Sequence, residues 1–399
     1  MIWQKVKNYY HFLQAFLSAF YFHFPGKKLK IIGVTGTDGK TTTVNLIFHI
    51  LKNAGYRVSM VSSIGAQIDS KHLDTGFHVT TPSPFQVQKL IKRALDAKSQ
   101  YLIVEATSHG LEQNRLAFIN FKIAVATNIT SDHMDYHKTW QNYANAKLKL
   151  FKHAKISILN MDDESYQVLK DKISGKIITY SLDKHADFNL KSHPLRPIFT
   201  QAYNRSNALA AAAAASMVGI PKTKILEALK SFKGISGRMQ QISIGQNFRA
   251  IVDFAHTPNA LKNVLGELKK EKSEKSRLIA VFGSAGERDK TKREVMGEIA
   301  ANLADVSVIT SEDPRSEKAS AIVLEISRGF KKTGKKENID YFKIADRKKA
   351  IRLAINLAKK GDIVVFLGKG HEKSMTIGNT DYPWDEVKEV EKAIGKRKG

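Results

Sequence analysis

Short apolar runs alternate along the chain with longer stretches in which apolar residues recur at helical spacing. Residues 30–35 predict a buried strand, and the periodic segment 41–53 that follows a glycine loop predicts a helix. Helical patterns recur at 85–97 and 140–153. Further strands are predicted at 57–62, 101–104, 123–128, 156–160, 176–181, 250–254, 278–282, 306–310 and 363–367. This alternation is typical of an α/β protein with a mostly parallel, doubly wound sheet.

Two boundaries divide this pattern. The alanine-rich stretch 208–217 predicts a helix that closes a first α/β domain, and glycine and serine cluster in the linker-like stretch 231–238. A second α/β pattern follows, with the character of a Rossmann-like domain. We therefore predict three parts, an aromatic-rich N-terminal helix (1–29), a central P-loop domain (30–235) and a C-terminal domain (236–399).

Residues 1–25 are crowded with aromatic side chains. The apolar run 12–24 is interrupted by Gln14 and His23 and is too short to span a bilayer. A signal peptide fits in outline, with lysines before an apolar stretch, but chemistry that consumes ATP places the protein in the cytoplasm. We expect an amphipathic helix that packs on the protein or makes a peripheral contact with a membrane or a partner.

Composition narrows the chemistry. The chain has 399 residues and no cysteine, which excludes disulfides, zinc–thiolate sites and thiol nucleophiles. The formal charge of +26 favours anionic partners, although general basicity of the source proteome would give the same value. No zinc-finger or aromatic-interleaved basic motif is present, so we expect no nucleic-acid binding.

The strongest local motif is GVTGTDGKTTT (33–43), which a predicted strand enters and a predicted helix leaves. Glycines let backbone N–H groups turn toward phosphate oxygens, and the start of the helix adds its positive dipole. Lys40 would reach the β- and γ-phosphates and Thr41 would hold Mg²⁺. Val34 stands where the strict P-loop pattern has its first glycine, but the strand–loop–helix context still predicts nucleotide binding.

Three residues beyond the loop bear on metal binding. Glu105 ends an apolar strand, where a carboxylate beside a phosphate loop suits a metal, although a solvated loop acid has the same sequence pattern. Taken alone, His133 is a hydrogen-bonded loop histidine and Lys147 a surface lysine on a helix.

Together these segments resemble the Mur ligase family, and within it the UDP-N-acetylmuramyl-tripeptide synthetases. The motifs that carry the resemblance, in family order, are GVTGTDGKTTT (33–43), TTPSP (80–84), VEATSHGLEQNR (104–115), TNITSDHMDYH (127–137), YANAKLKLF (143–151), YNRSNALAA (203–211), SGRM (236–239), VDFAHTPNAL (252–261), FGSAGERDKTKR (282–293), SEDPRSE (311–317) and GKGHE (368–372).

The resemblance implies an ATP-dependent ligase that turns a carboxylate into an acyl phosphate, which an amino acid then captures. It implies catalytic roles for Lys40, Glu105, His133 and Lys147, and two Mg²⁺ ions held by Thr41, Glu105, His133 and a carbamylated Lys147. Residues implied to bind ATP are Gly36, Thr37, Asp38, Gly39, Lys40, Thr41, Thr42, Asn204, Asn207, Arg238 and Asp253.

The same resemblance implies UDP-MurNAc-L-Ala-D-Glu as acceptor in peptidoglycan synthesis, bound by Thr80, Thr81, Ser108, Gln113 and Arg115. The amino-acid site would comprise Arg288, Asp313, Arg315, Gly368 and Glu372. Arg315 suits a distal carboxylate, as in enzymes specific for meso-diaminopimelate, whereas Asp313 replaces the family asparagine and adds charge that attracts an ammonium. We therefore expect a diamino acid, with meso-diaminopimelate ahead of L-lysine.

The sequence departs from the family before the phosphate loop. Family members have roughly a hundred residues there, forming a UDP-binding domain, whereas here about thirty precede it. The acceptor would then lack UDP, be held by the remaining pocket, or be gripped with help from the aromatic helix or another chain. Rival hypotheses are a folylpolyglutamate-synthase-like ligase, a non-catalytic nucleotide-binding partner and a basic RNA-binding module.

Overall fold

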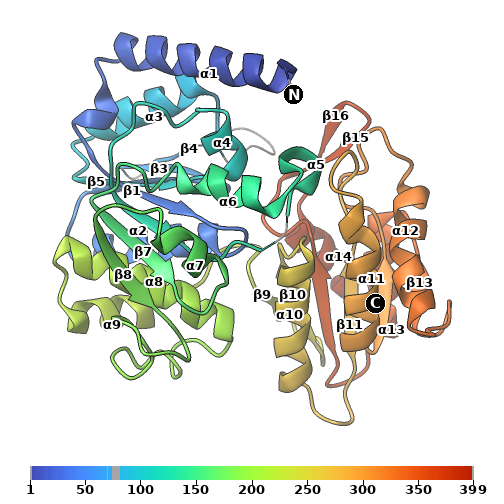
Figure 1. The fold of residues 1–399 in the computed structure, drawn as a ribbon. Coiled ribbons are helices and arrows are strands. Elements are labelled where there is room, and N and C mark those ends of the chain that lie inside the picture. The colour runs from blue at the N-terminus through green and yellow to red at the C-terminus, as the bar shows by residue number, and fades with distance from the viewer. Residues whose placement is uncertain (1, 70, 74–80, 131, 398–399) are drawn as a thin grey trace. The chain divides into compact units, whose positions relative to one another are not determined.

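The computed structural model describes residues 2–69, 71–73, 81–130 and 132–397. The chain divides into two compact units, Met1–Lys233 and Gly234–Gly399. Each unit is built around a sheet with helices packed on it (Figure 1). This arrangement confirms the expected fold class of two α/β domains.

The first unit contains an eight-stranded sheet in the order β4-β3-β2-β5-β1-β6-β7-β8. Its strands are β1 Lys30–Thr35, β2 Val58–Ser62, β3 Gly65–Ile68, β4 Lys71–Leu73, β5 Tyr101–Glu105, β6 Phe121–Ala126, β7 Ile156–Asn160 and β8 Lys176–Tyr180. β1 pairs in parallel with β5 and β6. Their carboxyl ends, and the loops that follow them, therefore share one edge of the sheet.

The antiparallel strands β3 and β4 extend this sheet beyond β2, and the sequence pattern did not predict them.

The helices of the unit are α1 Ile2–Tyr21, the 3₁₀ turn η1 Pro25–Lys27, α2 Lys40–Asn53, α3 Pro84–Asp96, α4 Ser108–Glu112, α5 Met134–His137, α6 Trp140–Leu148, α7 Ser165–Lys170, α8 Ala202–Val218 and α9 Lys222–Lys230. Several begin at a side-chain cap; the Ser83 hydroxyl accepts from the Gln86 amide, and Pro84 occupies the first turn of α3.

Alternation of side chains along the central strands creates a separate core on each face of the sheet. Ile32 and Val34 of β1 pack with α2 and α8, whereas Ile31 packs on the opposite face with α3 and α6. The alanines 208–215 of α8 are all fully buried, and their small side chains let α8 lie close against α2. The helix beside the phosphate loop is thus firmly packed.

The second unit contains a six-stranded sheet in the order β13-β12-β11-β14-β10-β9, parallel except for β9. Its strands are β9 Gln240–Ile242, β10 Arg249–Asp253, β11 Leu278–Phe282, β12 Val306–Ile309, β13 Tyr341–Lys343 and β14 Ile363–Leu367, with a separate hairpin of β15 Ser374–Ile377 and β16 Thr380–Pro383. Its helices are α10 Pro258–Glu271, α11 Thr291–Leu303, α12 Ala319–Lys332, α13 Arg347–Leu357 and α14 Glu386–Arg397. Across the described ranges of both units, every helix lacks the length or the apolarity of a membrane span.

Candidate active site

The phosphate loop lies between β1 and α2 and requires glycine at two positions. A Cβ on Gly36 would lie 1.8 Å from the Thr127 hydroxyl, and one on Gly39 would lie 2.2 Å from Asn207 Oδ1. Gly39 also has a φ of +80°. The loop is therefore confined between the start of α8 and the loop that follows β6.

Hydrogen bonds to the residues after β6 set the shape of the loop. The Thr37 amide donates to the Asn128 carbonyl (2.7 Å), and the Asp38 amide donates to Asn128 Oδ1 (2.9 Å). The Thr127 hydroxyl donates to the Asp38 carbonyl (2.6 Å). Because these bonds are made within the protein, the loop is held in shape without a ligand.

The first residues of α2 meet the carboxylate at the end of β5. The Thr41 hydroxyl lies 3.1 and 3.2 Å from the two carboxylate oxygens of Glu105 and 2.8 Å from the Ser63 hydroxyl. The Ser63 amide donates to Glu105 Oε2 (2.9 Å), and Glu105 is only 2% exposed. Lys40 Nζ donates to the Thr37 carbonyl (2.7 Å).

This donor set fits Mg²⁺. Hydroxyl and carboxylate oxygens are ligands that Mg²⁺ prefers, and it commonly uses one or two protein carboxylates while keeping waters and substrate phosphates as its other ligands. Within the described ranges, no three histidine, aspartate or glutamate side chains are grouped so as to hold a metal by themselves. Of the four predicted metal ligands, Thr41 and Glu105 are in direct contact.

Lys147 is buried, so the interpretation of this residue as a surface lysine is wrong. It is 1% exposed, and its Nζ donates to the Gly36 carbonyl (2.6 Å) and lies 4.4 Å from the centre of the Tyr143 ring. Burial, and then the charge of Lys40, hold the pKa of Lys147 well below its ordinary value, although Asp132 and other carboxylates nearby oppose this. The geometry favours a neutral amine beside the phosphate loop.

His133 lies in a cluster of rings next to this amine. Its ring centre is 4.7 Å from that of His109 and 6.5 Å from that of Tyr143, and its Nε2 lies 3.4 Å from Asp132 Oδ2. The neighbouring His137 has its pKa lowered to about 4, mainly by burial and then by the charge of His109. His137 is therefore neutral near pH 7.

Three of the predicted acceptor residues come together beside this cluster. The Arg115 guanidinium donates from Nε to Gln113 Oε1 (2.9 Å) and from Nη1 to the Thr81 carbonyl (2.9 Å). Gln113 Nε2 in turn donates to the Tyr136 hydroxyl (3.2 Å). Ser108 is buried at the first position of α4, and Thr80 lies outside the described residues.

The two asparagines predicted at the adenine lie one turn apart on α8, in different surroundings. Asn207 is buried against Gly39 and accepts from the Thr43 hydroxyl (3.5 Å). Asn204 donates to Gln201 Oε1 (3.2 Å). Asn207 thus contacts the phosphate loop itself, which the sequence did not indicate.

In the second unit, Asp253 organises the turn that contains Arg238. Asp253 Oδ2 accepts from the Met239 amide and Oδ1 from the Ala255 amide, both at 2.8 Å. The Arg238 guanidinium lies 4.4 Å from the centre of the Phe254 ring. Asp253 is 7% exposed and holds Arg238 and its neighbours in place.

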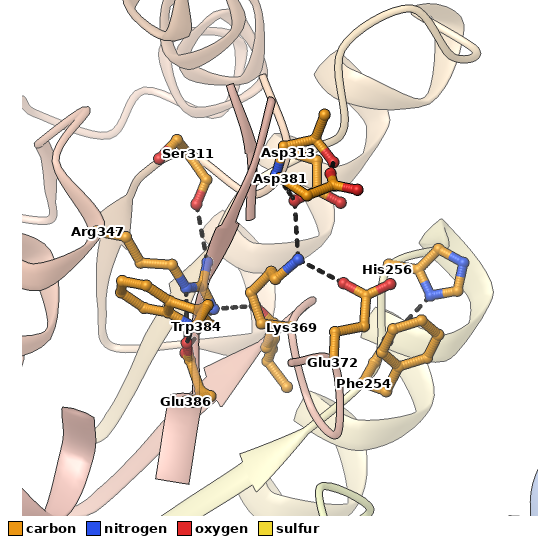
Figure 2. Close-up of polar contacts among 12 residues, drawn as sticks. Phe254, His256, Ser311, Asp313, Arg347, Lys369, Glu372, Asp381, Trp384 and Glu386 are labelled. Atoms are coloured by element: carbon orange, nitrogen blue, oxygen red, sulfur yellow. Dashed lines mark hydrogen bonds and ion pairs between the residues drawn. The ribbon is translucent and has the colours of Figure 1, made fainter. Parts of the chain in front are cut away.

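A buried lysine neutralises two of the predicted amino-acid-binding carboxylates. Lys369 is fully buried, and its Nζ donates to Asp313 Oδ1 (2.8 Å) and to Glu372 (Figure 2). Asp313 Oδ1 also accepts from the Thr376 amide (3.0 Å). Asp313 is therefore held by an ion pair within the protein, and its charge is already compensated.

Glu312, next to Asp313, has an oxygen that no hydrogen bond satisfies. Its Oε2 is buried without a hydrogen-bond partner, and burial raises its pKa to about 7. A Cβ on Gly368 would lie 2.8 Å from this oxygen, so glycine at that position leaves room for it.

The other two predicted amino-acid-binding residues lie on neighbouring loops. Arg315 adopts a φ of +53°, and its amide donates to the Thr376 carbonyl (3.1 Å). Arg288 lies in the loop between β11 and α11.

A second buried ion pair supports this region. Arg347 donates from Nε (2.9 Å) and Nη2 (2.6 Å) to the Glu386 carboxylate, and from Nη1 to the Ser311 carbonyl (3.0 Å; Figure 2). Trp384 Nε1 donates to the same carboxylate (2.7 Å). Because Ser311 precedes Glu312 and Asp313, this pair fixes the loop that carries them.

Sequence reasoning missed several residues of these sites, namely Ser63, Tyr136, Glu312 and Lys369. Tyr136, Glu312 and Lys369 lie inside motifs that were already recognised, so proximity to those motifs was a usable signal. Ser63 follows β2 and had no motif to mark it.

Comparisons with known proteins identify the family of both units. Residues 34–215 match the model of the Mur ligase middle domain, and residues 237–370 match that of the Mur ligase glutamate ligase domain. The chain is similar to a UDP-N-acetylmuramoyl-L-alanyl-D-glutamate–2,6-diaminopimelate ligase of Clostridium botulinum, with 37% identity over 95% of this chain and 81% of the relative.

Solved structures give the same result. A UDP-N-acetylmuramoyl-L-alanyl-D-glutamate–2,6-diaminopimelate ligase matches with a TM-score of 0.60 and 32% identity, covering 93% of this chain and 79% of the other. A folylpolyglutamate synthase of Mycobacterium tuberculosis complexed with ADP has a TM-score of 0.69 at 16% identity, covering 90% of this chain and 91% of the other. The second likeness concerns the fold alone.

Proposed function

Because this chain belongs to the Mur ligase family of ATP-dependent, amide-bond-forming enzymes, we propose that it adds a diamino acid to a muramyl peptide. The acceptor is the carboxylate of UDP-MurNAc-L-Ala-D-Glu or a related muramyl peptide, in the cytoplasmic synthesis of peptidoglycan precursors. The amino acid is meso-diaminopimelate, with L-lysine as the alternative. The 37% identical relative of Clostridium botulinum is a ligase for this acceptor and 2,6-diaminopimelate, which supports the acceptor and the first choice of amino acid.

The observation that carries the proposal is the group at the phosphate loop, formed by the buried Thr41, Glu105 and Lys147 and the half-buried Lys40. In the proposed reaction the loop amides and Lys40 bind the β- and γ-phosphates of ATP. Thr41 and Glu105 hold Mg²⁺, which when bound neutralises charge on the phosphoryl oxygens. The acceptor carboxylate attacks the γ-phosphorus and releases ADP; the amine then attacks the acyl phosphate and phosphate leaves.

Lys147 supports this assignment through its protonation state. A neutral amine has a lone pair that attacks the carbon of CO₂, and loss of one proton then leaves a carbamate with a negative charge. Burial lowers the pKa of Lys147 and so favours the neutral amine that this step requires, whereas an ammonium would not react. We propose that carbamylated Lys147, together with His133, completes the site for a second Mg²⁺.

The acceptor pocket is proposed around Arg115, whose planar fork suits a carboxylate or phosphate. Thr81, Ser108, Gln113 and Thr80 complete the predicted set. Helix α1 also reaches this region, since Gln4 Nε2 donates to the Tyr136 hydroxyl (2.5 Å) that Gln113 contacts. We therefore propose that α1 braces the acceptor pocket, and Gln4→Ala should weaken acceptor binding without changing ATP binding.

For the amino acid, we propose that Glu312, and not Asp313 as the sequence had suggested, attracts the ammonium of the diamino acid. Lys369 already compensates Asp313, so Asp313 adds little attraction for an ammonium. Glu312 Oε2 has no hydrogen bond within the protein, and the ammonium of a ligand beside it would donate one and favour the ionised carboxylate. Arg315 is proposed to bind the distal carboxylate, which distinguishes meso-diaminopimelate from lysine.

The test is phosphate release by the purified chain with ATP, Mg²⁺, bicarbonate and UDP-MurNAc-L-Ala-D-Glu, with single amino acids added in turn. Turnover that requires the acceptor and one diamino acid supports the proposal, and Lys40→Met should abolish it. Turnover only with a UDP-free muramyl peptide would restrict the acceptor to one without UDP, and turnover only with a folate acceptor would support the alternative ligase. ATP binding without turnover on any of these acceptors would contradict the proposal.

A further inference from the structure

Helix α1 directs small residues toward the protein and large apolar residues outward. Ala15, Ser18 and Ala19 are buried, with exposed fractions of 0%, 4% and 0%. The large apolar residues of α1 with exposed fractions from 41% to 71% are Val6, Tyr9, Tyr10, Phe12, Leu13, Phe16, Leu17, Phe20 and Tyr21. A helix that served only the core would bury its large apolar side chains and expose the others.

These nine residues form one continuous surface, here called the aromatic stripe. Their spacing of three and four positions places them along one side of an α-helix. Elsewhere in the described chain, large exposed apolar residues such as Leu324, Ile339 and Tyr382 lie on separate elements. A contiguous apolar surface of this kind marks an interaction site, whereas scattered residues need no explanation.

Contacts at several points along α1 hold the stripe in position. The Asn8 backbone carbonyl accepts a hydrogen bond from Asn114 Nδ2 (3.3 Å). The rings of Phe12 and Phe16 pack on the Phe118 ring, at centroid distances of 5.2 and 5.6 Å. Near the other end, the Phe22 ring lies 5.3 Å from that of Phe85 on α3. Figure 1 shows α1 running alongside α3 in the first unit.

The charge around the stripe identifies its partner. The sequence of residues 1–37 contains no aspartate or glutamate, and its lysines are Lys5, Lys7, Lys27, Lys28 and Lys30. The whole chain carries a formal charge of +26. Pairing of two copies through this surface would bring like charges together, whereas an anionic surface would attract them.

The side chains of the stripe also suit a bilayer surface. Tyrosine has an apolar ring and a polar hydroxyl and favours the boundary between lipid tails and headgroups. An apolar helical surface beside lysines is typical of helices that lie in this boundary. Because none of the described helices qualifies as a membrane span, such contact would be made along the surface.

We propose that the aromatic stripe docks this protein on anionic bilayers. The apolar side chains enter the boundary between headgroups and lipid tails, and the lysines near both ends of α1 contact lipid phosphates. The proposal does not depend on the substrate of the ligase, because it rests on α1 alone.

Flotation of the full chain with vesicles tests the proposal. Vesicles of phosphatidylcholine mixed equally with phosphatidylglycerol are compared with vesicles of phosphatidylcholine alone. The test variant is Leu13→Gln/Leu17→Gln/Phe20→Gln, and the matched control is Leu324→Gln/Ile339→Gln/Tyr382→Gln, which removes the same number of exposed apolar side chains from the second unit. Circular dichroism and nucleotide binding check that both variants fold.

The native chain and the control should float with the anionic vesicles, and added salt should weaken the binding. The α1 variant should partition at least about a hundredfold less, since three apolar side chains no longer insert. Failure of the native chain to bind anionic vesicles at low salt would overturn the proposal. Equal binding by the α1 variant would overturn it as well. A native dimer that the α1 variant dissociates, without vesicle binding, would assign the stripe to a second copy instead.

Discussion

Substitution of Gly39 by alanine should weaken ATP binding by closing the space that Asn207 occupies. The added Cβ would lie 2.2 Å from Asn207 Oδ1 and 3.0 Å from its Cγ. Asn207 is 7% exposed, so its side chain has little room to move away. Either the phosphate loop or the start of α8 must therefore shift.

The expected cost has two parts. The φ of +80° costs an alanine about 1–2 kcal/mol. Displacing the buried Asn207 amide from its contacts adds about 1–2 kcal/mol. If the loop carries most of this strain, ATP affinity falls by about thirtyfold to a thousandfold, at roughly 1.4 kcal/mol for each factor of ten.

Titration calorimetry with ATP measures this effect, and Gly219 provides the control. Gly219 has a φ of +101° but no atom within 4 Å of an added Cβ, so Gly219→Ala should cost stability alone. The double variant Gly39→Ala/Asn207→Ala should bind ATP more tightly than the sum of the single effects predicts. Native affinity in Gly39→Ala, or strict additivity in the double variant, would refute the steric explanation.

Four further predictions concern charged residues. Burial holds the pKa of Lys147 below its ordinary value, so unfolding takes up a proton. The free energy of unfolding, measured by denaturant titration, should therefore rise as the pH is raised toward 10, by up to about 1.4 kcal/mol per pH unit. This slope should be absent from Lys147→Met. The pKa of Glu312 is raised from 4.5 to about 7, so the folded protein keeps a proton that the unfolded chain loses. Stability of the second unit should therefore fall as the pH rises between these values, but not in Glu312→Gln. Arg347→Met leaves Glu386 buried without its ion pair and should cost about 3–5 kcal/mol on unfolding, most of which Arg347→Met/Glu386→Leu should restore. Arg315→Ala should reduce the preference for meso-diaminopimelate over lysine in the phosphate-release assay, and an unchanged preference would remove Arg315 from that role.

The elements around the phosphate loop were predictable because their signals are local. The glycines, the apolar strand before them and the periodic helix after them appear within about twenty residues of sequence. Boundaries were less accurate. The strand predicted at 123–128 is Phe121–Ala126, because Thr127 and Asn128 leave the strand to hold the phosphate loop.

The helix predicted at 140–153 shows the same limit. Its regular part ends at Leu148, and the residues that follow form turns, although their apolar spacing continues the helical pattern. The hairpins of β3 and β4 were missed because such short strands have too few residues to show alternation.

Burial of single charged residues was not predictable from local sequence. Lys147 lies on a helix rich in polar residues, and only the packing of α6 against the phosphate loop takes its amine out of water. The resemblance to the Mur ligases supplied a role for Lys147 that the local pattern contradicts. The structure supplies a physical basis for the proposed role, since the same burial that lowers the pKa of Lys147 favours the uncharged amine that carbamylation requires.

The second unit shows why counting charges in a motif is insufficient to assign specificity. The sequence EDPR (312–315) places two acids before Arg315, and the exchange to Asp313 had suggested an attraction for an ammonium. Lys369, more than fifty residues later, compensates Asp313 and leaves Glu312 as the acid with an unbonded oxygen. Because an uncompensated buried carboxylate is destabilising, a ligand that brings a cation to it gains that energy on binding. We therefore expect the acid that selects a diamino acid to be Glu312, whose Oε2 has no hydrogen bond within the protein, rather than Asp313, which Lys369 already binds.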